Sequence, residues 1–376
     1  MGYGNMGSAI AEDLAKSLPE SEIVIAGRRG KKAQEVASTL AKRNVSSVQL
    51  DAQSQAEVES ELRKFDLAVG ALPGNLGYKS AKAAITAGID FVDISYMPEN
   101  PLELHDAAKK ADVTVVPDCG VAPGLSSLLV GHAVAKLDYV DSVQVMVGGL
   151  PEGPVPPLDY TTTWSTEGLI DEYTRTAKIV QGSKVVEVEP LSGLEEIQFP
   201  GIGGLEAFYT DGLRTLLHTI KNVDTMWEKT LRYPGHVKKI KLLQNLGFLD
   251  EQPVKINGNS VSPRQMTIKL MDNKLQRPEV KDLLALKVEV GGSSAGSKKS
   301  YVYHLLDRYD ETHKVTAMAR TTGFPASIVA QLLAKASIEE KGILPMEKIA
   351  EHDEIFTRIL NELEKRHIHV KESISP

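Results

Sequence analysis

A glycine-rich loop at the start of the chain has the residue types and spacing of a phosphate-binding loop. Residues 1–7 read Met-Gly-Tyr-Gly-Asn-Met-Gly, a G-x-G-x-x-G pattern. The first glycine permits a tight turn, the second lets a pyrophosphate approach the backbone, and the third lets a helix pack closely. The free amides of the following helix attract phosphate. We therefore predict a dinucleotide site, the alternative being an ordinary glycine-rich turn; its residues are Gly2, Gly4, Asn5, Met6 and Gly7.

Four basic residues stand where a site selective for NAD would carry an acid. Residues 28–32 read Arg-Arg-Gly-Lys-Lys and follow an apolar run that ends near residue 27. Guanidinium groups form bidentate hydrogen bonds with phosphate. We therefore predict that Arg28 and Arg29 bind the 2′-phosphate of NADP. The alternative is a solvated cluster of charges at a site that still accepts NAD.

Small or polar residues follow two later apolar runs, at positions suited to a nucleotide. Ligands of open parallel sheets bind outside the carboxyl ends of the strands. Asp51 follows the run at 48–50 and is expected to contact the adenine side, or else to cap a helix. The segment after the run at 67–69 lets a nucleotide lie close to the backbone, or else forms a simple turn; its residues are Gly70, Ala71, Leu72 and Pro73.

The elements that position these residues alternate between helical and strand patterns over the first 120 residues. Short apolar runs predict buried strands, separated by helical spacing, at 23–25, 48–50, 67–69, 91–94 and 113–116. Strands that read as continuous apolar runs indicate a parallel sheet covered on both faces. The sequence therefore predicts an α/β fold with a doubly wound, Rossmann-type sheet.

The strand that normally precedes such a glycine loop has no counterpart in the sequence. The loop begins at Gly2, so Met1 alone stands where about five apolar residues are expected. This first strand is central in the sheet order 3-2-1-4-5-6. We expect the native protein to extend upstream by roughly six to ten residues. The rival expectation is a true truncation, with a neighbouring segment filling the gap.

The pattern changes after residue 122 to that of a second, α+β domain. Strand signals at 140–147, 184–188, 205–209, 284–290 and 302–306 predict a mostly antiparallel sheet. We divide the chain into a dinucleotide-binding domain at 1–122 and a substrate-binding and dimerisation domain at 123–312. Residues 313–376 are expected to form C-terminal helices that pack back on the first domain.

Composition excludes several classes of protein. The chain has 376 residues, 42% of them hydrophobic and 25% charged, with a net charge of −7 and no basic block, so a nucleic acid partner is not expected. It has neither the roughly 18 consecutive apolar residues of a membrane span nor a secretory signal. Cys119 is the only cysteine, which excludes an internal disulfide and indicates a reducing, cytoplasmic compartment. The histidines lack the spacing of metal ligands, so no metal is predicted.

Several motifs, in order along the chain, resemble the saccharopine dehydrogenase family. They are the glycine loop, residues 70–74, the Asp-Ile-Ser-Tyr segment at 93–96, and residues 117–126. Four further segments, at 147–151, 160–165, 210–214 and 230–236, are similar to its lysine 6-dehydrogenase branch. The resemblance implies hydride transfer between a nicotinamide and a carbon that bears nitrogen.

For the lysine branch, the resemblance implies that carbon 6 of L-lysine gives a hydride to the cofactor. Hydrolysis of the imine then yields 2-aminoadipate 6-semialdehyde and ammonia. It also implies a homodimer formed through the sheet of the second domain. Relatives that use NAD carry an acidic residue at the position of Arg28, so this sequence differs from them there.

Such a reaction requires a base that takes a proton from the substrate ammonium. Asp118 and His236 are the candidates, because histidine titrates near neutral pH and Asp118 follows the last strand of the first domain. The alternative for His236 is a residue at a helix start that is hydrogen-bonded to backbone. Cys119 is expected to be a buried small residue rather than a nucleophile.

An amino-acid substrate also requires groups that hold its two ends and its aliphatic stem. Arg232 and Arg214 are candidate clamps for the α-carboxylate. The alternative for Arg214 is the exposed face of a helix beginning near Gly212. Asp211 is a candidate partner of the α-ammonium, or else the cap of that helix. Ser95 is expected near the nicotinamide, and the stem is expected to lie against Tyr160 and Trp164, which otherwise pack in the core.

The sequence is also compatible with two other functions. One is a reductase of the saccharopine or polyamine-precursor type, which condenses an aldehyde with an amine. The other is a nucleotide-sensing protein that keeps the fold without turnover.

Overall fold

The computed structural model describes residues 1–40, 42–277 and 279–376. Its first part is a parallel sheet whose five strands follow one another along the chain: β1 (Ile23–Gly27), β2 (Val45–Gln49), β3 (Leu67–Gly70), β4 (Asp90–Asp93) and β5 (Thr114–Val116). The helices between and before them are α1 (Asn5–Ser17), α2 (Gly30–Leu40), α3 (Gln55–Leu62), α4 (Gly74–Ala87), η1 (Pro101–Leu104) and α5 (His105–Lys110). The predicted doubly wound sheet is confirmed.

The parallel sheet is interrupted where its central strand is expected. The strands pair as β2-β1 and, separately, as β3-β4-β5-β16, where β16 (Gly342–Ile343) comes from near the C-terminus. Two residues bridge the halves, because Gly2 N–H donates to Ala26 O (2.8 Å) and Ala71 N–H donates to Met1 O (2.8 Å). Beyond them, a cavity of about 200 Å³ lies between β1 and β3 against α1. Whether further residues precede Met1 stays a prediction.

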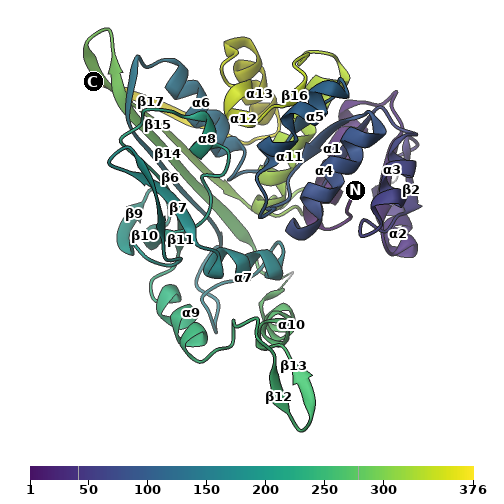
Figure 1. Cartoon of the computed structure of the whole chain (residues 1–376), viewed down its shortest axis with the longest axis horizontal. Helices are drawn as coiled ribbons and strands as arrows, with labels where there is room; N and C mark the ends of the chain where they lie inside the picture. Colours follow the sequence, from purple (N-terminus) through teal and green to yellow (C-terminus); the bar gives the residue numbers. More distant parts are fainter. Residues whose placement is uncertain (41, 278) are drawn as a thin grey trace.

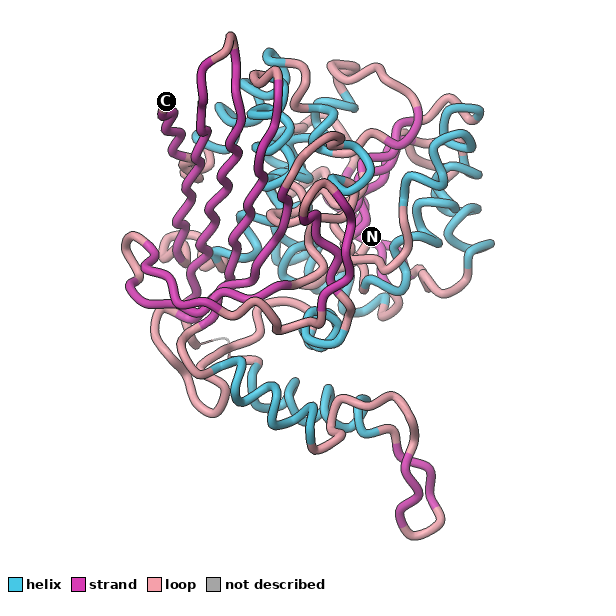
Figure 2. The backbone as a smooth tube through the Cα atoms, turned by 60° about the vertical axis from the view of Figure 1, so that its left-hand side comes forward, coloured by secondary structure: helices cyan, strands magenta, loops and turns pink. Residues whose placement is uncertain are grey.

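The second part is built on a larger, mostly antiparallel sheet, as predicted. Its strands are ordered β17-β15-β14-β6-β11-β10-β9, with β7 paired to β11 and β8 to β7. Only β6 and β11 are parallel neighbours among the described strands of this sheet. The strands are β6 (Tyr139–Pro151), β7 (Ala177–Gln181), β8 (Lys184–Val188), β9 (Glu195–Phe199), β10 (Gly203–Tyr209), β11 (Thr225–Arg232), β14 (Asp282–Ser294), β15 (Ser297–Arg308) and β17 (Lys371–Ser375). Figure 2 shows these long strands side by side.

The predicted strands at 284–290 and 302–306 pair with each other, and both are longer than predicted. The ladder of β14 and β15 continues to Ser294 and Ser297, so only Ala295 and Gly296 form the turn. Residues of β14 alternate between buried and half-buried over 286–292, because only one face of the sheet is covered. The helices on that face include α6 (Leu125–Ala135) and α11 (Ala317–Ala334).

The helix α11 joins the two sheets, because it packs against α1 on one side and β14 on the other (Figure 1). Its residues Ala326 and Val329 share one apolar core with residues of both sheets. The remaining C-terminal helices are α12 (Met346–Ile349) and α13 (Asp353–Lys365). Arg366, just after α13, pairs with Asp13 of α1 at 2.7 Å, and this ion pair joins the C-terminal segment to α1.

An arm of 40 residues projects from the body and has no counterpart among the predicted elements. It runs from His236 to Leu275 and contains α9 (His236–Asn245), β12 (Val254–Ile256), β13 (Asn259–Val261) and α10 (Pro263–Leu275). Figures 1 and 2 show the β12–β13 hairpin at its tip. Two short helices, α7 (Thr166–Thr174) and α8 (Leu216–Thr219), complete the fold. No helix in the described part of the chain is long and apolar enough to cross a membrane.

Candidate active site

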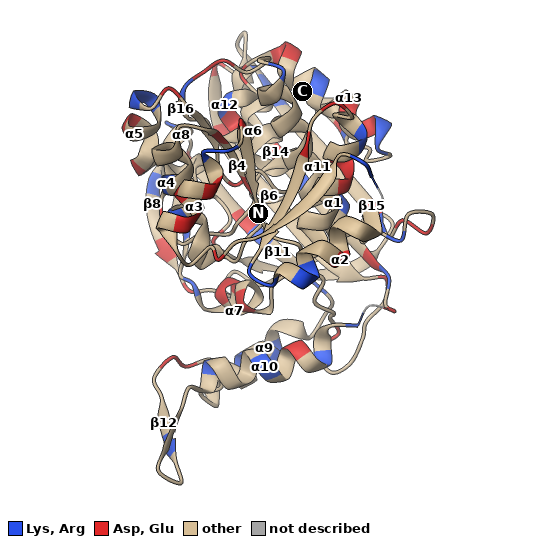
Figure 3. Cartoon of the chain, turned by 90° about the vertical axis from the view of Figure 1, so that its right-hand side faces the viewer, with Lys and Arg blue, Asp and Glu red and all other residues tan. Residues whose placement is uncertain are grey.

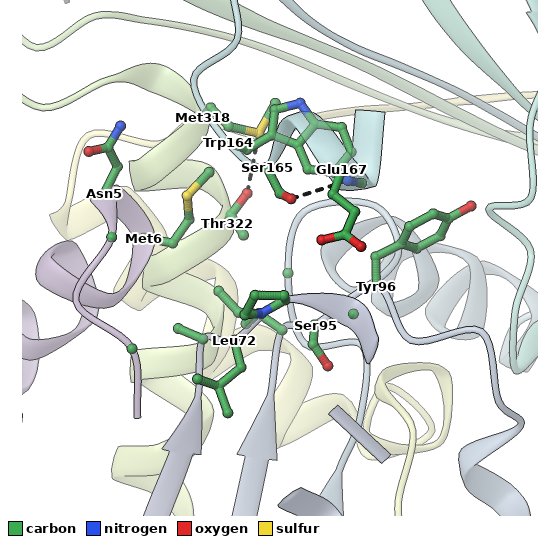
Figure 4. A pocket seen from close by; sticks show the side chains of 18 of the residues that line it. Asn5, Met6, Leu72, Ser95, Tyr96, Trp164, Ser165, Glu167, Met318 and Thr322 are labelled. Atoms are coloured by element: carbon green, nitrogen blue, oxygen red, sulfur yellow. Dashed lines mark hydrogen bonds between the residues drawn. The ribbon is translucent and has the colours of Figure 1, made fainter. Parts of the chain in front are cut away.

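A cavity of about 990 Å³ separates the two parts of the molecule. The carboxyl ends of the parallel strands form one wall, and α7, β11 and β6 form the other. Figure 4 shows side chains from both walls facing each other, with Asn5, Met6 and Leu72 on one side and Trp164 and Met318 on another. Most of the predicted site residues line this cavity. The exceptions are Gly70, Asp118, Asp211, Arg214 and His236.

The glycine loop forms one end of the cavity with the geometry that a pyrophosphate requires. Gly2 has a φ of +101°, which favours glycine, and a side chain at Gly7 would collide with the carbonyl of Gly2. Gly4 caps the start of α1 without a side-chain hydrogen bond, so the first amides of the helix are available to a phosphate. The loop and helix therefore fit a dinucleotide.

The basic segment after β1 lies beside this loop. Arg29 donates to Tyr3 Oη from its backbone amide (3.3 Å) and from Nε (3.4 Å). Lys32 lies over the ring of Tyr3, 5.9 Å from its centre. Arg28 is exposed, lines the cavity, and makes no hydrogen bond or ion pair within the described residues. Its guanidinium is therefore available to a 2′-phosphate.

Two further strand ends provide the surface on which a nucleotide would lie. Asp51 lines the cavity after β2 and accepts a hydrogen bond from Gln53 N–H (3.0 Å). The cap of α3 is Ser54 rather than Asp51, so this alternative for Asp51 is wrong. Ala71, Leu72 and Pro73 line the cavity after β3. Gly70 lies behind them and leaves room for the side chain of Asp93.

Ser95 links the buried carboxyl group of Asp93 to the cavity. Ser95 follows β4 and lines the cavity. The Ser95 hydroxyl donates to Asp93 Oδ2, and Ser95 N–H donates to the same oxygen at 3.1 Å. Burial raises the pKa of Asp93 to about 7, and the nearby Asp118 adds to the shift while the hydrogen bonds from Ser95 oppose it. The pair can therefore exchange a proton near neutral pH.

Asp118, Asp211 and Arg214 form a buried ion-pair network behind the cavity wall. Arg214 Nε lies 3.4 Å from Asp118 Oδ2, and its Nη1 lies 3.9 Å from Asp211 Oδ2. Asp118 and Arg214 both adopt left-handed backbone, with φ of +50° and +52°. Burial raises the pKa of Asp118, although Arg214 opposes the shift. The predicted helix near Gly212 is wrong, because α8 begins only at Leu216 and Arg214 is buried in this network.

The network supports the aromatic ring that does face the cavity. Tyr96 lines the cavity next to Ser95, and its hydroxyl donates to Asp211 O at 2.8 Å. Arg175 lies over the ring at 4.2 Å from its centre, and Arg214 lies at 5.7 Å. The three predicted residues of the network therefore position Tyr96 from behind, and their side chains do not reach the cavity.

His236 is fully buried at the start of α9 and does not line the cavity. Its Nδ1 lies 2.7 Å from Leu158 O and its Nε2 lies 2.8 Å from Tyr173 Oη. Burial lowers the pKa of His236 to about 3, and Arg232 acts in the same direction. This arrangement favours the alternative of a structural histidine that is hydrogen-bonded to backbone.

The helix α7 brings carboxylates to the opposite wall. Ser165 caps it by accepting from Gly168 N–H (3.1 Å). Glu167, Asp171 and Glu172 all line the cavity. Asp171 is paired with Arg175 and Arg264, whereas Glu167 makes no hydrogen bond or ion pair within the described residues. Figure 4 shows Glu167 extending toward the segment that holds Ser95 and Tyr96.

The strand β11 adds a row of polar side chains to the same wall. Glu228, Thr230 and Arg232 alternate along the strand and line the cavity. Arg232 Nη2 binds Glu172 Oε2 at 2.8 Å, and Thr230 Oγ1 donates to Glu172 Oε1 at 2.6 Å.

Glu228 is only 3% exposed and accepts from Thr210 Oγ1 at 2.5 Å. Burial raises the pKa of Glu228 well above its ordinary range, and the neighbouring Glu172 and Asp211 add to the shift. The protonated form of this carboxyl group is therefore favoured more than in an exposed glutamic acid.

Tyr160 and Trp164 form the apolar side of this wall. Trp164 Nε1 donates to Tyr160 Oη at 3.1 Å, and Arg232 lies 4.6 Å from the centre of the Tyr160 ring. Both residues line the cavity, and Tyr160 is also part of the core beneath α7. As predicted, Cys119 is fully buried. It lies against Met346.

The carboxylates of α7 and β11 are site residues that the sequence reasoning does not identify. A signal is present, because Glu228, Thr230 and Arg232 occupy alternate positions of a strand and so share one face. Glu167 and Asp171 are four residues apart, a spacing that places them on one face of a helix. Neither pattern indicates which face meets the cofactor.

Comparison with known proteins identifies both parts of the chain. The family model named saccharopine dehydrogenase NADP binding domain matches residues 1–116. The model named saccharopine dehydrogenase C-terminal domain matches residues 120–368. The first match confirms NADP as the predicted cofactor, and both agree with the resemblance seen in the motifs.

Individual relatives are distant. Saccharopine dehydrogenase (NADP(+), L-glutamate-forming) of Schizosaccharomyces pombe is 28% identical over 245 residues, which cover 62% of this chain and 54% of that protein. The chain thus spans about half the length of this relative. Carboxyaminopropylagmatine dehydrogenase of Synechocystis sp. is 22% identical over 375 residues, which cover 93% and 92% of the two chains. The structure of apo saccharopine dehydrogenase (L-Glu forming) from Saccharomyces cerevisiae superposes with a TM-score of 0.79 at 20% identity, covering 99% and 98%, and shows the same fold.

Proposed function

We propose that this chain, which belongs to the saccharopine dehydrogenase family, is an oxidoreductase that moves a hydride between NADP and the nitrogen-bearing carbon of an amino-acid substrate. More specifically, we propose the oxidative deamination of L-lysine at carbon 6. The observation that carries this choice is the excess of carboxylates on the wall that faces the cofactor loop. The wall holds Glu167, Asp171, Glu172 and Glu228.

These carboxylates suit a substrate whose reacting end is an ammonium. Glu167 has no partner within the described residues and extends into the cavity, so it is available to a cationic group. The cations at this end are Arg232, which is already paired with Glu172, and Arg277, which binds Pro156 O at 3.1 Å. One substrate carboxylate can be bound at this end of the cavity. Several substrate carboxylates would lie close to the acidic side chains of the wall.

The proposed reaction has two steps, the oxidation of the amine and the hydrolysis of the imine. R–CH2–NH3⁺ and NADP⁺ give R–CH=NH2⁺, NADPH and one proton. Water then adds to the imine carbon, the C–N bond breaks, and the products are R–CHO and ammonium. When bound, NADP⁺ supplies the acceptor for the hydride. The residues of this chain must bind the amine, take the released proton and admit one water molecule.

The Ser95–Asp93 pair is suited to receive that proton. Ser95 lines the cavity next to the segment on which the nicotinamide half of a dinucleotide would lie, and its hydroxyl is hydrogen-bonded to Asp93. Because the pKa of Asp93 is about 7, the carboxylate form needed to accept a proton becomes dominant above neutral pH. Amine oxidation should therefore accelerate as the pH rises through about 7.

A reductase that joins an aldehyde to an amine is the second candidate. Arg277 favours it, because this half-buried side chain lines the cavity together with Arg232 and could bind a second carboxylate. Relatives named saccharopine dehydrogenase and carboxyaminopropylagmatine dehydrogenase support this candidate as strongly as the first.

The two candidates are separated by supplying each set of substrates and following absorbance near 340 nm. L-Lysine with NADP⁺ is expected to produce NADPH and an equal amount of ammonia. NADPH consumption only with an aldehyde and an amino acid together would support the reductase. Cofactor binding with no turnover of either set would indicate a nucleotide-sensing protein.

The role of the cavity wall is tested by Glu167→Gln. Loss of one charge-assisted hydrogen bond should raise KM for the amine by about tenfold or more while the Kd of NADP stays constant. The matched control is Glu103→Gln, an exposed acid on η1 outside the cavity. Equal KM values for both variants would contradict the assignment of Glu167.

A further inference from the structure

Tyr3 stands between the first two glycines of the phosphate-binding loop and packs on the end of β1. Gly27, the last residue of β1, leaves room for the phenol ring, because a Cβ atom at this position would overlap Cε1 and Cδ1 of Tyr3. The ring also packs against the small core that contains Ala11, Ile25 and Ala33. These contacts fix the hydroxyl group of Tyr3 beside the basic segment that follows β1.

The hydroxyl group of Tyr3 accepts two hydrogen bonds from one arginine. Arg29 donates to it from its backbone amide (3.3 Å) and from its side-chain Nε (3.4 Å). The Nη1 and Nη2 groups of Arg29 make no hydrogen bond or ion pair within the part of the chain that the structure describes. An arginine held through Nε keeps both Nη groups for another acceptor, and two parallel N–H groups match two oxygens of a phosphate.

A second cation lies against the same ring. Lys32 Nζ is 5.9 Å from the centre of the Tyr3 ring. Arg28, Arg29 and Lys32 all line the cavity, and none of them forms an ion pair within the described residues. Figure 3 shows this basic segment where the chain enters α2. Because unpaired cations so close together repel one another, this end of the cavity favours an anionic group.

The cofactor carries such an anion at the corresponding place. In dinucleotide-binding folds, the ribose next to the adenine lies at the end of the strand that follows the glycine loop and its helix. That strand is β1 in this chain. NADP has a phosphate on the 2′-oxygen of this ribose, whereas NAD has a free hydroxyl group. The groups around Tyr3 therefore meet the part of the cofactor in which NADP and NAD differ.

We propose that Tyr3 determines cofactor specificity by holding the Arg29 guanidinium in the orientation that binds the 2′-phosphate of NADP. Tyr3 is a positioning residue: its hydroxyl group accepts from Arg29, and of the two side chains only the guanidinium contacts the phosphate. NAD has no group that uses this arrangement, so its affinity does not depend on the hydroxyl group. This role depends only on the cofactor, and it is the same for amine oxidation and for the reverse reduction.

Tyr3→Phe is the informative substitution, because it removes the hydroxyl group and keeps the ring in place on Gly27. The loss of the hydrogen bonds to Arg29 should raise the Kd of NADP about fivefold in calorimetry, while the Kd of NAD changes less than about twofold. The fragments 2′,5′-ADP and 5′-ADP localise the effect, since they differ only in the 2′-phosphate. The first fragment should lose affinity as NADP does, and the second should not.

A double-mutant cycle with Arg29→Ala shows whether Tyr3 acts through that side chain. Arg29→Ala alone should raise the Kd of NADP at least about tenfold, because a charge-assisted contact with the phosphate is lost. Tyr3→Phe added to Arg29→Ala should raise the Kd further by less than about twofold, since only the bond to the backbone amide of residue 29 is then left to lose.

The matched control is Tyr78→Phe, which alters a half-buried tyrosine of α4 outside the cavity and should leave both Kd values unchanged. Thermal unfolding of each variant verifies that the fold is intact. An unchanged Kd of NADP in Tyr3→Phe would overturn the proposal. Equal losses of affinity for NADP and NAD would also overturn it, and would assign Tyr3 to the shape of the glycine loop. A full loss that persists in the Arg29→Ala background would overturn it in favour of direct contact between the hydroxyl group and the phosphate.

Discussion

Replacement of Asp93 by asparagine should remove a specific pH dependence from the stability of the protein. Asp93 is fully buried, and its pKa is raised from 3.8 to about 7, chiefly by burial. A carboxyl group whose pKa is raised on folding stabilises the folded state below the unfolded pKa. That contribution is lost as the pH rises through the folded pKa.

The size of the effect follows from these two pKa values. Between pH 5 and pH 8 the unfolded carboxyl group stays ionised, while the folded one changes from protonated to ionised. At 1.4 kcal/mol per pKa unit, the wild type should lose about 2 to 3 kcal/mol of unfolding free energy from this group. The asparagine side chain of the variant does not titrate, so the difference between Asp93→Asn and wild type should grow by that amount in favour of the variant.

Urea unfolding of both proteins at pH 5 and pH 8 measures this difference. Other buried acids, such as Asp307, whose pKa is raised to about 6, titrate in both proteins and cancel. The control is Asp106→Asn, an exposed residue in the first turn of α5, for which the change should stay below about 0.5 kcal/mol. An Asp93→Asn difference that is equal at the two pH values would refute the argument that Asp93 is protonated in the folded protein near pH 6.

Three further predictions concern the cofactor, the cavity wall and the interrupted sheet. Arg28→Asp should weaken NADP binding by roughly 1–3 kcal/mol in calorimetry, with NAD binding little affected, because the variant removes a guanidinium available to the 2′-phosphate; an unchanged Kd for NADP would exclude this contact. Arg232→Ala should lower unfolding stability by about 3 kcal/mol, since Glu172 loses its partner, and should raise KM for the amine far more than the Kd of NADP; a loss confined to cofactor affinity would place Arg232 at the phosphate site. Four valine or isoleucine residues added before Met1 should fill the cavity between β1 and β3 and raise the melting temperature by at least about 3 °C, whereas four serines should not; equal melting temperatures would show that the cavity does not accept a strand.

The cofactor half of the site could be predicted from the sequence because its signals are local. The glycine loop lies within seven residues, and Arg28 follows the next strand directly, so spacing along the chain determines both positions. The same applies to the parallel sheet, whose buried strands read as continuous apolar runs. Ala71, Leu72 and Pro73 lie at the cavity because the carboxyl ends of parallel strands share one edge.

The substrate half depends on contacts between segments far apart in the chain. The chemistry of histidine makes His236 a candidate base, but its neighbours Leu158 and Tyr173 are 78 and 63 residues away and bury it. Arg214 has the chemistry of a carboxylate clamp, yet its partner Asp118 comes from the other domain. Glu167 could not be predicted as a site residue, because nothing in the sequence shows that the first turn of α7 faces Ser95.

The arm could not be predicted for a different reason. Its helices α9 and α10 carry apolar residues on two faces, so their periodicity is weak, and its hairpin strands have only three residues each. Such a pattern is typical of a segment that packs on more than one surface.

In the proposed reaction, the hydride leaves the nitrogen-bearing terminal carbon of an amine whose ammonium faces Glu167. The most direct measurement is the reaction of L-lysine carrying two deuterium atoms on carbon 6 with NADP⁺, followed by mass spectrometry of the reduced cofactor. We expect NADPH with one deuterium per molecule and an equal amount of ammonia. Unlabelled NADPH from this substrate, or a label transferred only from lysine deuterated at carbon 2, would contradict it.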